Sequence, residues 1–158
     1  MLEDLLFVFT LITALGCGLV AGIFFAFSTF VMKALARVPA AHGNAAMQAI
    51  NITVINPLFM LAFMGTAVTC VVVIVFTFMT WDESDPVLLL TGSLLYLIGT
   101  LLVTMAFNVP RNNALAATDP ESDDGARVWS GYVRSWTAWN HLRTVAALAS
   151  SVLLTLGL

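Results

Sequence analysis

The chain has 158 residues, of which 60% are hydrophobic and only 9% are charged, and its mean hydropathy is +0.97. A soluble domain of this length needs a polar surface that this composition cannot supply, so we expect an all-α integral membrane protein. The net charge of −3 is segregated along the chain rather than collected in a basic patch, which argues against a nucleic-acid partner.

Four long uncharged runs predict four membrane-spanning helices packed as one bundle. A helix needs about 20 apolar residues to cross the hydrocarbon core, and the first three runs reach this length. The uncharged run after Arg143 is too short, so the last helix must begin before this residue. We therefore expect a single domain over residues 1–158, with spans at about 5–32, 56–80, 87–108 and 137–157.

The distribution of cations predicts the orientation of the bundle. Cytoplasmic loops retain Lys and Arg, whereas acids contribute little to this bias. The second connection, 81–86, and the N-terminus carry acids only. We therefore expect both termini to be non-cytoplasmic, in a bacterial inner (plasma) membrane. The six cations all belong to the first and third connections and the helix ends beside them: Lys33, Arg37, Arg111, Arg127, Arg134 and Arg143.

Small residues recur every fourth position along the first predicted helix. Ala14, Gly18, Gly22 and Ala26 would form a stripe on which another backbone can approach closely, as is common between helices in lipid. The stripe predicts a packing seam, either inside the bundle or between copies of the chain. The sequence leaves both open, so a homo-oligomer through Gly18 and Gly22 is one expectation.

The segment that precedes the second span is polar on one side. Asn44, Gln48 and Asn51 repeat at helical spacing beside an apolar stripe, which predicts an amphipathic segment at the membrane interface. Asn56 and Pro57 then open the span itself, because Asn is a favoured helix cap and Pro is well tolerated in a first turn.

A polar stripe runs along the third predicted helix. Polar groups in a spanning helix face protein or water rather than lipid. Two roles would account for polar side chains at these positions: hydrogen bonding between helices, or a path for a substrate. The members lie four residues apart: Gly92, Tyr96, Thr100, Thr104 and Asn108.

The last helix combines aromatic and polar residues on one predicted face. Trp129, Tyr132, Trp136, Asn140 and Arg143 follow in steps of three and four residues. Trp, Tyr and Arg near a helix end often act as interfacial anchors. A cation at membrane depth, however, needs a partner and is a functional hypothesis by default. Both interpretations remain open for this cluster.

Two motifs resemble those of the anthrone oxygenase-like family of small four-helix membrane proteins, many of which are classed as a domain of unknown function. The motifs are NVPRNNAL at 108–115 and WTAWNHLRT at 136–144, and FFAFS at 24–28 and MQAIN at 47–51 are also similar. Fungal relatives are linked to the oxidation of anthrones to anthraquinones. The resemblance therefore implies a membrane oxidoreductase that acts on a lipophilic aromatic substrate. The distribution of cations places its candidate catalytic groups at the cytoplasmic face.

Side chains near the two motifs fit such a reaction. An anthrone carries an acidic CH2 beside a carbonyl, and its carbanion reacts with O2 without a metal or other cofactor. His141 is the candidate base, because its ordinary pKa lies near physiological pH. Arg143 and an amide from Asn108 or Asn140 are the candidate stabilisers of the enolate oxygen. His141 and Asn140 point about 100° apart on a helix, so one site must wrap the helix to use both.

The candidate substrate-binding residues are aromatic or carry amides. Trp136 or Trp139 could stack on the rings of a flat substrate. The remaining candidates are Asn112, Gln48, Asn51 and Asn56.

Two alternatives stay open. A metal or haem would need His42 and His141 as ligands, with carboxylates scarce at that depth. A non-enzymatic membrane protein, either a small-molecule permease or an assembly subunit, would also suit the stripes of polar and small residues. An ion-coupled transporter is disfavoured because the predicted spans contain no Asp or Glu.

Overall fold

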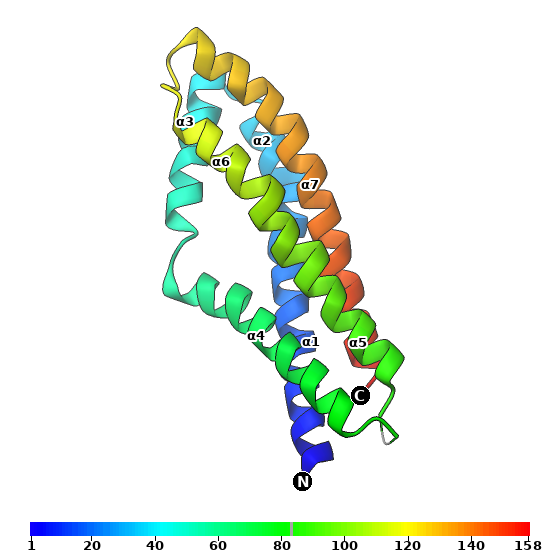
Figure 1. Ribbon diagram of the computed structural model, residues 1–158. Helices are drawn as coiled ribbons and strands as arrows, with labels where there is room; N and C mark the ends of the chain where they lie inside the picture. Colours follow the sequence, from blue (N-terminus) through cyan, green and yellow to red (C-terminus); the bar gives the residue numbers. More distant parts are fainter. Residues whose placement is uncertain (83) are drawn as a thin grey trace.

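The computed structural model describes residues 1–82 and 84–158, and 87% of the chain is helical with no strand in these residues. The π-helical turns, marked η, continue the helices beside them, so Leu2–Leu35 and Pro86–Ala116 are each one continuous helix. The elements in chain order (Figure 1) are α1 (Leu2–Ala26), η1 (Phe27–Val31), α2 (Met32–Leu35), α3 (Ala40–Thr53), α4 (Pro57–Met79), α5 (Pro86–Leu94), η2 (Leu95–Leu102), η3 (Thr104–Asn108), α6 (Val109–Ala116) and α7 (Asp123–Leu156).

Three of the helices are long and apolar enough to cross a membrane: Leu2–Leu35, Pro57–Met79 and Pro86–Ala116. The expected all-helical fold is thus confirmed, and such helices are typical of a membrane protein. α7 is 34 residues long but is not among the three, because Asn140, His141 and Arg143 interrupt its apolar second half.

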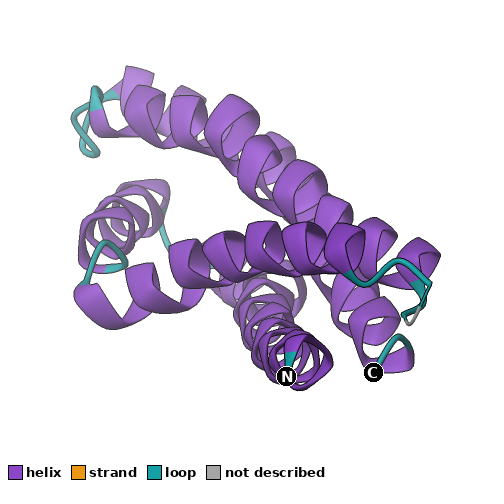
Figure 2. Cartoon of the chain, turned by 60° about the horizontal axis from the view of Figure 1, so that its bottom comes forward, coloured by secondary structure: helices purple, strands orange, loops and turns teal. Residues whose placement is uncertain are grey.

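The helices pack side by side, and the chain ends meet at one end of the molecule. α1 packs along α7 and against α4, while α5 and η2 pack on α7 and α4. Both termini lie at the same end as the turn between α4 and α5, whereas α3, α6 and the start of α7 lie at the other end (Figure 1). Figure 2 brings the terminal end forward and shows that only short loops join the helices.

The predicted start of the second long apolar helix is confirmed. Asn56 caps α4, and its Oδ1 accepts hydrogen bonds from the backbone amides of Leu58 and Phe59 at 3.1 and 3.0 Å. The preceding helix, α3, turns its polar side inward: Gln48 donates to the backbone oxygens of Leu115 and Thr118. α3 therefore packs on α6 and α7 through its amides, and large apolar side chains such as Ile52 face outward.

Glycines allow close contacts between helices. A Cβ atom at Gly99 on η2 would lie only 2.5 Å from the Cβ of Ala146 on α7. A Cβ at Gly18 would lie 3.2 Å from the hydroxyl of Ser151, so this part of the predicted small-residue stripe packs inside the molecule. At Gly22 a Cβ would meet no atom of the described chain within 4 Å. The stripe on α1 therefore leaves the protein core towards the C-terminal half of this helix.

The π-helical turns keep the polar stripe of the third helix on one side. In a regular α-helix a spacing of four residues drifts by about 40° per step, which would put Gly92 and Asn108 on nearly opposite sides. The i→i+5 turns of η2 and η3 are wider and offset this drift. Gly92, Tyr96, Thr100 and Asn108 are consequently all buried, and Thr104 is half-buried.

Members of this stripe make hydrogen bonds between helices. The Tyr96 hydroxyl donates to the Phe63 backbone oxygen at 2.9 Å, and the Ser150 hydroxyl donates to the Gly92 oxygen at 2.7 Å. Of the two interpretations of the stripe, these contacts support interhelical hydrogen bonding over this part of the helix.

Candidate functional site

The predicted face of α7 is buried against the other helices. Its aromatic residues form a stack in which the ring centroids of Trp129 and Tyr132 lie 5.8 Å apart, and those of Tyr132 and Trp136 lie 5.9 Å apart. Asn140 is completely buried and Arg143 is 4% exposed. The helical spacing in the sequence therefore located the inner face of α7 correctly.

Asn140 and Arg143 form the centre of a hydrogen-bond network. The Asn140 amide donates to the Phe24 backbone oxygen and to Ser28 Oγ, both at 2.7 Å, and its Oδ1 accepts from Arg143 Nη2 at 2.7 Å. Arg143 Nη1 donates to Thr104 Oγ1 at 3.0 Å. The hydroxyl of Thr144 donates to the Asn140 backbone oxygen at 2.8 Å and lies 3.2 Å from Ser28 Oγ. The amide thus orients the guanidinium.

The positive charge of Arg143 is compensated without a carboxylate from the described residues, whose ion pairs lie elsewhere. Its Cζ atom lies 4.1 Å from the ring centroid of Phe24 and 5.2 Å from that of Trp136. Such cation–π contacts stabilise a desolvated cation, yet an unpaired buried charge remains costly. The guanidinium is therefore a strong binding group for an anion or for developing negative charge.

Each π-helical segment contributes one hydroxyl to this network. Ser28 lies on η1, Thr100 on η2 and Thr104 on η3, and Thr100 donates to the Arg143 backbone oxygen at 3.4 Å. Short π-helical turns inside α-helices occur frequently at functional sites. Their wider turns here bring three different segments onto the same two residues of α7.

A cavity of about 400 Å³ opens beside Arg143. Its polar side consists of Asn51, Thr104, Asn112 and Arg143, and aliphatic, aromatic and Met side chains from α1, α3, α4, η2 and η3 form most of the remaining wall. Such a mainly apolar cavity with a few convergent polar groups is typical of a small-molecule site.

The cavity reaches the outer surface of the apolar helices. Ile55, Met64 and Met105 line it and are at the same time exposed. Because these side chains come from the α3–α4 connection, α4 and η3, the cavity opens between spanning segments. A lipophilic molecule at this opening would meet exposed apolar side chains.

A chain of polar side chains forms one rim of the cavity. The Tyr132 hydroxyl donates to Asn112 Oδ1 at 2.9 Å, and it lies 3.5 Å from Asn51 Nδ2, which donates to it. Burial raises the pKa of the Tyr132 hydroxyl above its ordinary range, so this group stays a hydrogen-bond donor at neutral pH. Of the predicted substrate-binding residues, Asn51, Asn112 and Trp136 therefore lie together at the cavity.

The structure separates His141 from Arg143. The imidazole is exposed and lines a different groove, on the opposite side of α7 from the cavity. A single site does not wrap the helix, so the expectation that His141 acts as the base beside Arg143 does not fit this geometry. The physical reason is the rotation of about 100° per residue, which turns position 141 away when position 140 points inward.

Two other predicted site residues have structural partners. Trp139 stacks on Phe107, with ring centroids 3.6 Å apart, and Arg111 lies over its ring. Asn108 is buried and donates to the Trp136 backbone oxygen at 3.3 Å. Neither Trp139 nor Asn108 lines the cavity, so Asn108 supports Trp136 rather than facing a ligand.

The remaining predicted residues lie away from the cavity wall. Gln48 holds α3 against α6, and Asn56 caps α4. His42 is exposed on α3, and it shares no cavity lining with His141. Within residues 1–82 and 84–158, no three His, Cys, Asp or Glu side chains gather into a group that could hold a metal ion.

Sequence reasoning missed three contributors to the network. Phe24 and Ser28 lie one helical turn apart, and Thr144 follows Arg143 directly. A Ser one turn after a Phe in an apolar helix is an ordinary pattern, so only the fold reveals that it faces Asn140.

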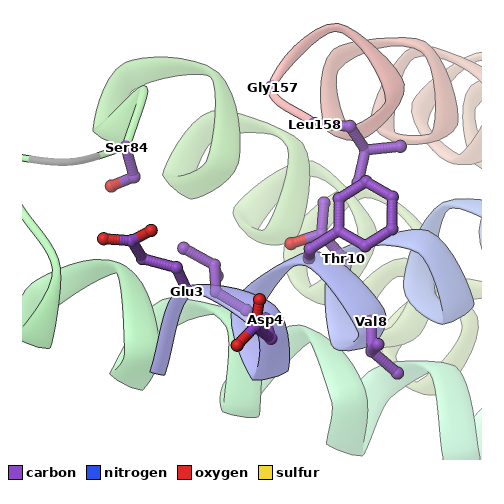
Figure 3. A pocket seen from close by; sticks show the side chains of 9 residues that line it. Glu3, Asp4, Val8, Thr10, Ser84, Gly157 and Leu158 are labelled. Atoms are coloured by element: carbon purple, nitrogen blue, oxygen red, sulfur yellow. The ribbon is translucent and has the colours of Figure 1, made fainter. Parts of the chain in front are cut away.

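A second cavity, of about 430 Å³, lies at the terminal end of the molecule (Figure 3). Glu3 and Asp4 project from the first turn of α1, and Ser84 and Leu158 complete the opening. Asp4 is highly exposed and pairs with the N-terminal amino group at 3.0 Å. The charged groups at this second cavity are therefore hydrated, whereas the cation at the Arg143 cavity is desolvated.

A sequence model of the anthrone oxygenase family matches residues 59–153, which is more than half of the chain. The chain belongs to the anthrone oxygenase family. The match runs from α4 into the second half of α7, and it includes Asn140, Arg143 and Thr104. No curated protein and no solved structure matches the chain. The family name suggests an oxygenase-like role, and the cavity beside Arg143 is the site where this family member could hold a substrate.

Proposed function

We propose that this anthrone oxygenase family member is a four-helix bundle of the bacterial inner membrane with α7 as its fourth span. The outward side chains of the second half of α7 support this, because they are apolar and recur at helical spacing: Val145, Leu148, Val152 and Leu156. The distribution of cations supports an orientation with both termini outside the cytoplasm. The Arg143 cavity then lies in the half of the membrane nearer the cytoplasm.

The proposed reaction is the oxidation of a lipophilic anthrone-like substrate by O2, without a cofactor. The observation that carries this proposal is the unpaired, desolvated Arg143 guanidinium at the polar end of an apolar cavity. A flat aromatic molecule that carries an acidic CH2 beside a carbonyl fits both features. Its ring system matches the apolar walls, and its enolate oxygen would supply the negative charge that Arg143 lacks.

The protein would act chiefly by stabilising the enolate. No His, Asp or Glu is among the described residues that line the cavity, so the substrate proton passes to water at the opening. Arg143, oriented by Asn140 and Thr104, favours the ionised form in a low-dielectric site. Trp136 beside the guanidinium offers an aromatic surface to the substrate rings.

The oxidation then follows from the chemistry of the carbanion. Its electron pair reduces O2 to the level of a peroxide as a carbon–oxygen bond forms, and the peroxide takes up a proton. Loss of the second proton from the same carbon cleaves the oxygen–oxygen bond, forms the carbonyl and releases hydroxide. In balance, one CH2 group and one O2 give one carbonyl group and one water.

The test is oxygen consumption by the purified protein with anthrone, followed together with the absorbance of anthraquinone. We expect one O2 consumed per anthraquinone formed, at a rate proportional to protein and above that of a protein-free detergent blank. The matched control substrate is an anthrone with two methyl groups on the reacting carbon, which cannot form the enolate and should not react.

A rate equal to the blank would overturn the proposed activity. If anthrone still bound to the protein without turnover, the non-enzymatic alternative of a small-molecule permease would be favoured. Oxidation of the dimethylated compound would contradict the enolate mechanism while leaving an oxygenase activity in place.

A further inference from the structure

A basic groove lies on the side of α7 that faces away from the Arg143 cavity. It has a volume of about 370 Å³ and runs between the end of the first long helix and residues 133–141 of α7. Lys33, Arg134 and His141 line it, and all three side chains are exposed. Two of the six cations of the chain thus meet at one groove, together with an imidazole that the oxidation chemistry does not use.

The charges of this groove are not neutralised by acids of the described chain. The ion pairs in residues 1–82 and 84–158 join Asp4 to the N-terminal amino group and Asp124 to Arg127. No Asp or Glu is among the described residues that line the groove. An anion that entered it would therefore meet cationic side chains without repulsion from a carboxylate.

The floor of the groove combines one unpartnered hydroxyl with apolar surface. Thr137 Oγ1 is buried and has no hydrogen-bond partner among the described residues, although a buried hydroxyl normally has one. Met32, Ala36, Val133 and Ala138 supply apolar side chains around it. The groove therefore offers polar contacts to a head group and an apolar surface to the chains below it.

We infer that this groove binds the phosphate group of an anionic phospholipid. Lys33 and Arg134 would provide the charge, with the His141 ring N–H and the Thr137 hydroxyl as further donors. The location favours a lipid over a free anion, because the groove lies beside the apolar helix surface, where Phe30 and Val145 are exposed. The inference uses the membrane placement of the helices, but it does not depend on the proposed oxidation.

The test is native mass spectrometry of the full chain, released from detergent with an equimolar mixture of phosphatidylglycerol and phosphatidylcholine. Wild-type protein should retain phosphatidylglycerol preferentially. The double variant Lys33→Gln/Arg134→Gln should lose this preference by about tenfold or more, since each basic residue contributes to anionic lipid attraction. The double variant Arg37→Gln/Arg127→Gln removes the same charge outside the groove and should keep the preference.

A second variant separates the groove from general charge effects. Thr137→Val changes no charge and should weaken the preference by about threefold through the loss of one hydroxyl. Equal retention of the two lipids by wild type would overturn the inference, as would equal losses in the two charge-matched double variants. Inorganic phosphate that displaced phosphatidylglycerol at equal concentration would assign the groove to free phosphate and overturn the lipid assignment.

Discussion

The two sides of α7 place neighbouring residues of one motif in opposite environments. Asn140 and Arg143 face inward, where helices and aromatic rings exclude water, whereas Thr137 and His141 line a groove on the other side. On the inner side a single cation is held by neutral partners. On the groove side the ionisable groups are exposed and can be hydrated. Residues of the 136–144 motif therefore line two different cavities, because successive side chains of a helix point in directions about 100° apart.

The difference between the sides is chiefly one of dielectric environment. A charge interaction that is weak in water becomes several-fold stronger where water is excluded. Under the proposed function, Arg143 would therefore change the acidity of a bound substrate, while exposed groups such as Lys33 and His141 would act mainly on ligands that bring their own charge.

The largest expected effect is on turnover. Arg143→Gln should lower the rate of anthrone oxidation by about a hundredfold or more, because it removes the group that stabilises the enolate oxygen. His141→Gln, with the same substituent on the groove side, should leave the rate within the scatter of the assay. The measurement is oxygen uptake by folded protein, checked by its detergent unfolding transition.

Arg143→Lys provides a second variant if the Gln variant does not fold. It retains the charge but loses the planar fork that contacts Asn140 and Thr104, so an intermediate rate is expected. Equal rates for wild type and all Arg143 variants would show that the cavity does not act through this cation.

The next effect is on stability. Asn140→Leu should lower the free energy of unfolding by about 3 kcal/mol, because it removes the buried amide that accepts from the Arg143 guanidinium and donates to the Phe24 oxygen and to Ser28. His141→Leu should change it little, since the imidazole is exposed. Equilibrium unfolding in mixed detergent micelles measures both, and similar losses would contradict the contrast between the two sides.

Helix packing provides a third comparison. Gly99→Ala should destabilise the protein by about 2 kcal/mol, because its methyl group would be forced against Ala146 on the inner side of α7. Gly131→Ala, on α7 itself, would place a methyl group where no described atom lies within 4 Å. The latter should be neutral or stabilising by up to about 1 kcal/mol through helix propensity. Thermal unfolding of the two variants in one detergent tests the pair.

The smallest effect concerns single hydroxyls. Thr144→Val should cost about 1 kcal/mol, because its hydroxyl contacts the Asn140 oxygen and Ser28. Thr137→Val is the matched change on the groove side and should be neutral or slightly stabilising, since that hydroxyl is buried without a partner. A greater loss at Thr137 than at Thr144 would indicate that the groove has a structural partner in the folded protein.

The sequence by itself determined the features that depend on local periodicity. The apolar runs define the helices, Asn56 and Pro57 define the start of α4, and the spacing from Trp129 to Arg143 defines the inner face of α7. These patterns are readable because each rests on residues within a few turns of one another, where helix geometry decides which side chains share a face.

Only the tertiary structure decided which faces meet and where the cavity opens. The two groups that accept from the Asn140 amide lie more than a hundred positions away, on α1 and η1, and α3 turns its amides inward against a distant helix. Contacts between distant segments follow from the fit of whole surfaces, so the separation of His141 from Arg143 became visible only when the helices were assembled.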